Sequence, residues 1–72
     1  GDVIDVQAET ARLEKAAGKT EKDAGGLRGR LGNPKFVEHA EPEVIEETRD
    51  KLAALEDDLV RIRAALAQLA AM

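Results

Sequence analysis

The second half of the chain carries large apolar side chains in an unbroken alternation of three- and four-residue steps. The members of this stripe are Ile45, Thr48, Leu52, Leu55, Leu59, Ile62, Leu66 and Leu69. Such spacing over more than three heptads is typical of a helix that packs lengthwise on another helix. Pro42 suits the first helical position, because its fixed φ fits a helix and its missing N–H needs no partner there. The pattern predicts a helix over about 42–71.

The first half repeats the same spacing with smaller side chains, which predicts a helix over about 3–31. Its stripe consists of Val3, Val6, Thr10, Leu13, Ala17, Thr20, Ala24, Leu27 and Leu31. Glycines inside this segment each cost about 1 kcal/mol relative to alanine in a helix interior. We therefore expect a kink, fraying or a break near Gly25-Gly26. Gly32, followed by Asn33-Pro34, is a helix stop.

The connection, about 32–41, is too short for anything but an antiparallel return. We therefore predict an all-α fold, an antiparallel two-helix coiled-coil hairpin that occupies 1–72 as a single domain. A chain of 72 residues buries little surface and usually depends on a partner or on covalent links. We expect it to be a fragment of a larger protein.

Pairing the two stripes in full predicts one register, in which Val6 faces Leu66 and Ala24 faces Thr48. That register also brings opposite charges together, namely Asp23 with Lys51 and Glu21 with Arg49. A slip by one heptad would leave Val6 unpaired and set Asp23 against Asp58, so we prefer full pairing. The apolar residues that remain predict a small apolar cap at the tip, made of Leu31, Phe36, Val37 and Val44.

Composition excludes several kinds of site. The chain has no cysteine, so it holds no disulfide and no zinc–thiolate centre. Gly18-Lys19-Thr20 imitates the end of a phosphate-binding loop but lacks the earlier glycine and the preceding strand. His39 is the only imidazole, and we interpret it as a solvated loop histidine. We predict no catalytic residue, no metal ligand and no cofactor, and no apolar run is long enough to span a membrane.

The formal net charge of −4 hides a segregation of charge along the chain. Residues 12–35 hold seven basic and three acidic side chains, whereas residues 36–58 hold two basic and nine acidic ones. Four of the cations step by 3, 4 and 3, so they share the helix face that points away from the seam. Glu47, Asp50 and Asp57 take the corresponding outward positions of the second helix.

Basic stripes of this kind bind phosphate backbones through counterion release. The predicted RNA-binding residues are Arg12, Lys15, Lys19, Lys22, Arg28, Arg30 and Lys35. Long coiled coils also solvate their outer faces with lysine and arginine, so spacing alone leaves both interpretations open.

The turn and its flanks resemble a known family. Arg12-Leu13-Glu14-Lys15, the turn Arg30-Leu31-Gly32-Asn33-Pro34-Lys35-Phe36-Val37 and the entry Ala40-Glu41-Pro42-Glu43-Val44-Ile45 are similar to the C-terminal arm of valyl-tRNA synthetases. In that family the arm is an antiparallel coiled coil that reaches the corner of the L-shaped tRNA, where the D and TΨC loops meet.

The resemblance implies a non-catalytic arm of a cytoplasmic valine–tRNA ligase, which helps position tRNA for aminoacylation. The implied partner is tRNA, by resemblance tRNA-Val, and the parent enzyme would use ATP at a site outside this fragment. Asn33 and Phe36, at the tip, are candidates for contact with a base, although Phe36 also suits the apolar cap.

Two alternatives remain at this point. The chain also suits a nucleic-acid-binding hairpin of an F-type ATP-binding-cassette protein. It equally suits a structural coiled coil that pairs with another protein, in which case the outward cations serve only solubility. A self-contained hairpin predicts a monomer, whereas an assembly module does not.

Overall fold

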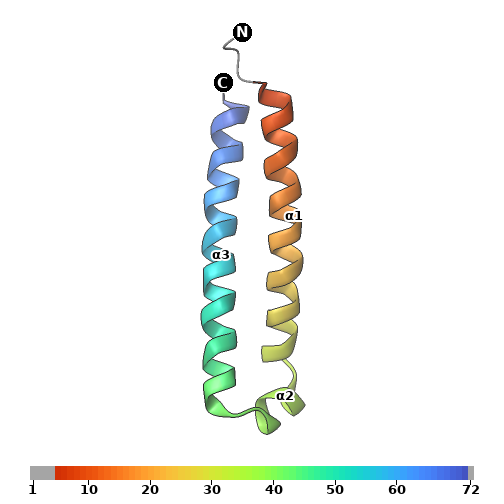
Figure 1. Ribbon diagram of the computed structural model, residues 1–72, viewed down its shortest axis with the longest axis vertical. Coiled ribbons are helices and arrows are strands. Elements are labelled where there is room, and N and C mark those ends of the chain that lie inside the picture. The colour runs from red at the N-terminus through yellow and green to blue at the C-terminus, as the bar shows by residue number, and fades with distance from the viewer. Residues whose placement is uncertain (1–4, 72) are drawn as a thin grey trace.

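Two long helices joined through a short one make up the chain. The computed structural model describes residues 5–71, which form α1 (Val6–Leu31), α2 (Pro34–His39) and α3 (Pro42–Ala70), with no strand in that range. The helices α1 and α3 lie side by side and run in opposite directions, and α2 lies at the tip between them (Figure 1). The prediction of an all-α chain with two long packed helices is confirmed.

Local sequence sets the ends of the long helices. Helix α1 begins at Val6 because the Asp5 carboxylate accepts a hydrogen bond from the Ala8 N–H at 3.1 Å. The predicted start near residue 3 lies outside the described residues. Helix α1 ends at Leu31, and the N–H of the capping residue Gly32 donates to the Arg28 carbonyl at 2.9 Å. Helix α3 begins at Pro42, as predicted.

The connection is more ordered than the predicted turn, because it contains α2. Asn33 caps this helix by accepting a hydrogen bond from the Lys35 N–H at 3.0 Å, and Pro34 occupies its start. Ala40 ends it, donating its N–H to the Phe36 carbonyl at 2.8 Å. A capping asparagine followed by proline is a helix-start signal, so the residues that end α1 also begin α2.

The break expected at Gly25-Gly26 is absent, because α1 is one continuous helix through both residues. The glycine cost remains, but both glycines are exposed and contribute no side chain to the seam. Ala24, immediately before them, has no exposed surface and anchors this turn against α3. Packing of the inner face therefore outweighs the low helix propensity.

The interior of the hairpin is thin. Only Ala24, Leu59 and Thr48 are buried among the described residues, at 0%, 3% and 7% exposure, and the other seam residues are half-buried. The Thr48 hydroxyl donates to the Val44 carbonyl at 2.7 Å, so the one buried polar side chain has a partner. Two helices alone cannot enclose a larger core, and stability therefore depends on few positions.

The predicted register is wrong by one heptad. Glu21 lies 3.2 Å from Arg63 instead of beside Arg49, and Arg28 lies 3.2 Å from Glu56. Full pairing of the stripes would separate Glu21 and Arg63 by about twelve residues along the axis, or about 18 Å. A one-heptad shift reduces this to about 7.5 Å, which the two side chains span because each leans toward the N-terminus of its own helix.

The shift also agrees with packing near the tip. Leu55 lines the same surface groove as Asp23 and Leu27, so it lies level with that part of α1. Ala24 therefore faces Leu55, and Thr48 lies closer to the end of α1.

Charge explains why the observed register is preferred. Because each side chain leans toward the N-terminus of its own helix, full pairing would bring Glu21 toward Glu56 and not toward Arg49 as predicted, and it would bring Arg28 toward Arg49. Both are pairs of like charge. The observed register replaces both with attractive pairs. It moves Val6 beyond the last apolar residue of the α3 stripe, yet Val6 is still half-buried, like most of the seam.

The apolar cap predicted at the tip is only partly formed. Leu31 and Phe36 are half-buried, as predicted. Val37 and Val44 remain 40% and 42% exposed, so they do not belong to it. The reason is α2, whose helical geometry turns Val37 away from Phe36.

Candidate nucleic-acid interface

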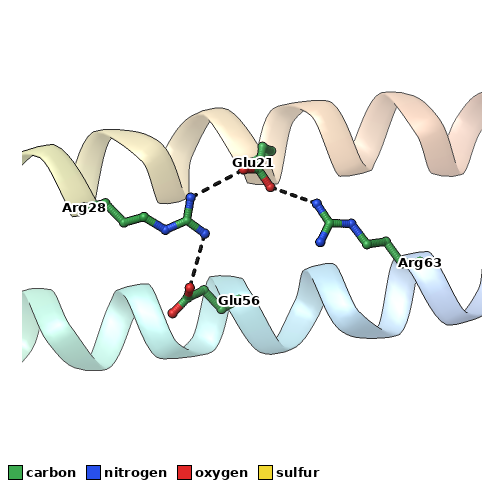
Figure 2. A network of polar contacts seen from close by, with 4 residues as sticks. All are labelled: Glu21, Arg28, Glu56 and Arg63. Atoms are coloured by element: carbon green, nitrogen blue, oxygen red, sulfur yellow. Dashed lines mark hydrogen bonds and ion pairs between the residues drawn. The ribbon is translucent and has the colours of Figure 1, made fainter.

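An ion-pair network crosses one edge of the hairpin. Figure 2 shows Glu21 and Arg28 of α1 pointing toward Glu56 and Arg63 of α3. The Arg28 guanidinium donates to Glu56 at 3.2 Å and to Glu21 at 3.4 Å, and Arg63 donates to the second Glu21 oxygen at 3.2 Å. Each helix contributes one acid and one base seven residues apart, in an order that matches only when the helices are antiparallel.

This network occupies one of the predicted RNA-binding cations. Hydrogen bonds to Glu56 and then to Glu21 raise the pKa of the Arg28 guanidinium above its ordinary value. Both acceptors compete with any phosphate that approaches Arg28. The structure therefore assigns Arg28 to the helix–helix contact and separates it from the other six predicted cations.

The basic stripe, defined as Arg12, Lys15, Lys19 and Lys22, lies on the outward side of α1. All four side chains are exposed. Arg12 forms an ion pair with Glu9, one turn earlier on the same helix. No ion pair within residues 5–71 holds the three lysines. The three lysines therefore present charge to solvent that no ion pair within residues 5–71 neutralises.

The tip carries two further cations, which lie on two different helices. Arg30 is exposed in the last turn of α1, and Lys35 is exposed in the first turn of α2. Asn33 uses its side-chain oxygen to cap α2, whereas its amide nitrogen makes no hydrogen bond within residues 5–71 and can donate to a base. Phe36 is half-buried, so part of its ring remains open to solvent.

The outward side of α3 has the opposite sign. Glu47, Asp50 and Asp57 are all exposed, and Asp57 pairs with Arg61 at 2.8 Å. Near the tip a shallow groove between α2 and α3 is rimmed by Glu38, Glu46 and Asp50. An anionic ligand is therefore attracted to α1 and repelled by α3.

A second groove lies beside the basic stripe. Its lining consists of Lys22, Asp23, Gly26, Leu27, Arg30 and Leu55. It is an open surface groove with a volume of about 360 Å³. It combines cations with an apolar floor, and it depends on α3 for one wall.

Other kinds of site find no support in the described part of the chain. Residues 5–71 contain no cluster of three or more histidine, aspartate or glutamate side chains arranged to hold a metal ion. No helix in this range combines the length and apolarity needed to cross a bilayer. His39 is exposed in the last turn of α2.

Sequence reasoning found the stripe but missed both the network and the groove. The network had a signal in the sequence. Glu21 and Arg28 are seven residues apart, and Glu56 and Arg63 have the same spacing and the same acid-to-base order. In antiparallel helices that shared order sets each acid against a base. The groove had none, because Leu55 joins the α1 residues only in the observed register.

Comparison with known proteins identifies the family. Residues 5–70 match the model of the family described as valyl tRNA synthetase tRNA binding arm. The chain is 59% identical over 69 residues to a valine–tRNA ligase of Ruegeria pomeroyi, covering 96% of the chain and 7% of that protein. It is 54% identical to the valine–tRNA ligase of Cereibacter sphaeroides, over 93% of the chain and 7% of that protein.

A third relative, the valine–tRNA ligase of Granulibacter bethesdensis, is 48% identical over 93% of the chain and 8% of its own length. The chain thus spans less than a tenth of these curated relatives. No solved structure is significantly similar to it. The match favours the synthetase arm over the F-type and purely structural hypotheses, and the chain belongs to the valyl tRNA synthetase tRNA binding arm family.

Proposed function

We propose that this chain is the non-catalytic tRNA-binding arm of a valine–tRNA ligase, and that it contacts the tRNA corner to help position tRNA for aminoacylation. The family match and the ligase relatives support this proposal. The observation that carries it is the basic stripe, because its three lysines face solvent with no ion-pair partner among residues 5–71.

The geometry suits a phosphate backbone. From Arg12 to Lys22 the stripe extends along about 15 Å of continuous helix, so its cations keep fixed spacing. Each phosphate that a cation neutralises releases counterions, and this supplies affinity without reading sequence. The acidic side of α3 repels the same backbone, which leaves α1 as the face that meets the RNA.

In this proposal the arm is a rigid pair of helices in a fixed register. We infer that α1 and α3 pack as an antiparallel coiled coil and that the chain is monomeric, with the network of Glu21, Arg28, Glu56 and Arg63 holding the register. Phosphate contacts carry no sequence information, so the arm contributes affinity for tRNA, while choice of tRNA-Val falls to the rest of the enzyme. ATP chemistry likewise belongs to that remainder, and the proposed setting is the cytoplasm.

Charge reversal in the full-length ligase tests the proposal. Lys15→Glu combined with Lys19→Glu is expected to raise the KM for tRNA, because two attractive phosphate contacts become repulsive. Valine-dependent ATP–pyrophosphate exchange should not change, since that step uses no tRNA. Lys19→Glu alone has a matched control in Arg61→Glu, an equal change of charge on the outward side of α3. An unchanged KM for tRNA in the double variant would refute the proposal.

A further inference from the structure

The groove beside the basic stripe has the features of a site for one nucleotide. Lys22 and Arg30 stand at its two ends, eight positions apart on α1, or about 12 Å along the axis. Between them Leu27 and Leu55 supply an apolar floor. Cations thus flank an apolar surface, which matches the alternation of phosphate and base in a nucleic acid strand.

Gly26 keeps this groove open. A Cβ built at residue 26 meets no atom within 4 Å, so packing within the hairpin does not require glycine there. Glycine also weakens a helix relative to any ordinary residue. The residue lines the groove, so a long side chain at this position would take up part of the groove. Gly18, Gly25 and Gly29 are equally open, but among these four glycines only Gly26 lines the groove, so an occupant of the groove gives a reason for glycine at this position.

We propose that the groove holds a single nucleotide that the bound RNA turns out of its base stack. The base or ribose lies on Leu27 and Leu55 over Gly26, and Lys22 and Arg30 contact the phosphates on either side. The Asp23 carboxylate, also in the lining, accepts a hydrogen bond from an exocyclic amine or a ribose hydroxyl.

Size and chemistry support one nucleotide as the occupant. Sequence-specific RNA recognition mostly targets single-stranded loops, bulges and ends, whose unstacked bases can turn out toward the protein and form hydrogen bonds along their edges. A groove of about 360 Å³ between two helices is on the scale of one such group. The apolar floor offers no hydrogen bond or charge to a phosphate, and the Asp23 carboxylate repels one, so a phosphate alone does not suit the groove. The inference rests on the proposed RNA binding, but it concerns the flank of α1 and not the tip residues Asn33 and Phe36.

A pair of neighbouring substitutions tests the groove. Gly26→Gln places a neutral side chain over the floor, and Gly25→Gln adds the same side chain one position away, outside the lining and also in open space. Both are expected to raise the thermal midpoint of the chain, because glutamine favours helix more than glycine does. Gly26→Gln should weaken binding of a tRNA transcript about tenfold, which corresponds to about 1.4 kcal/mol for the displaced nucleotide. Gly25→Gln should change that affinity less than about twofold.

A fully paired RNA duplex is the second probe, because it reaches the stripe but offers no turned-out base. The inference expects Gly26→Gln to leave duplex affinity unchanged. Equal losses for tRNA and duplex would overturn it, since the new side chain would then only obstruct the stripe. Unchanged tRNA affinity in Gly26→Gln would also overturn it.

The charge-reversed variant Lys15→Glu with Lys19→Glu, measured in the same assay, separates the two proposals. If it weakens tRNA binding while Gly26→Gln does not, RNA binding by the stripe stands and the nucleotide site fails. If neither variant weakens tRNA binding, both proposals fail.

Discussion

Engineered cysteine pairs offer a direct measure of the register between α1 and α3. The chain has no cysteine of its own, so two introduced thiols report only on each other. Ala24→Cys with Leu55→Cys matches the observed register, and Ala24→Cys with Thr48→Cys matches full pairing of the stripes. The two partner positions lie seven residues apart on α3, or about 10.5 Å along its axis. A disulfide needs its Cβ atoms about 3.5–4.5 Å apart, so one register cannot close both bonds.

The assay is mild oxidation in native buffer, followed by alkylation of the remaining thiols and mass spectrometry. The structure predicts rapid closure of the 24–55 pair and slow closure of the 24–48 pair, with the difference lost in denaturant. Exchanging the charges of Glu56 and Arg63 should lower the yield of the 24–55 bond, because both attractive contacts of the network become repulsive. Faster closure of the 24–48 pair in the unaltered background would refute the register.

Three further outcomes follow from burial, capping and assembly. Leu59→Ala should lower the free energy of unfolding by about 2–4 kcal/mol in urea titrations, since Leu59 is 3% exposed. Val60→Ala, at a site 64% exposed, should change the free energy of unfolding by no more than about 0.5 kcal/mol. Equal losses in the two variants would contradict the assignment of Leu59 to the buried seam. Asn33→Ala should weaken the helical NMR signals of α2 and Asn33→Ser should not, because serine preserves the cap. A similar loss of tRNA affinity in both variants would indicate that Asn33 contacts a base. Light scattering should give the monomer mass of 7.7 kDa at all concentrations, and a doubled mass would oppose a self-contained hairpin.

The long helices could be predicted because their signals are local. The leucine and isoleucine spacing of α3 and the position of Pro42 need no knowledge of a partner. Helix α1 was harder, since Gly25-Gly26 argued for a break and only contact with α3 shows why the helix continues. Asn33-Pro34 is a signal for the start of α2. The same residues follow Gly32 and were interpreted only as the end of the first helix, so the short second helix was missed.

The register could not be settled by apolar pairing, because each stripe repeats every heptad and a shift changes only the ends. Charges flanking the seam distinguish the possible registers. The acid-to-base order that Glu21 and Arg28 share with Glu56 and Arg63 identifies the observed register, because it sets each acid against a base of the antiparallel helix. The basic stripe was predictable because outward faces follow from spacing within one helix. The groove was not, since Leu55 enters it only after the register is known.

The salt dependence of tRNA binding tests the central claim most directly. Titrations of the chain with a tRNA transcript across a series of salt concentrations give the slope of log Kd against log salt concentration. If the stripe contacts phosphates, replacing Lys19 by glutamine should reduce the magnitude of that slope by about 1, because one fewer counterion is released. Arg61→Gln, on the outward side of α3, should leave it unchanged. A slope that is the same in Lys19→Gln as in the unaltered chain would show that Lys19 contacts no phosphate and would contradict the account.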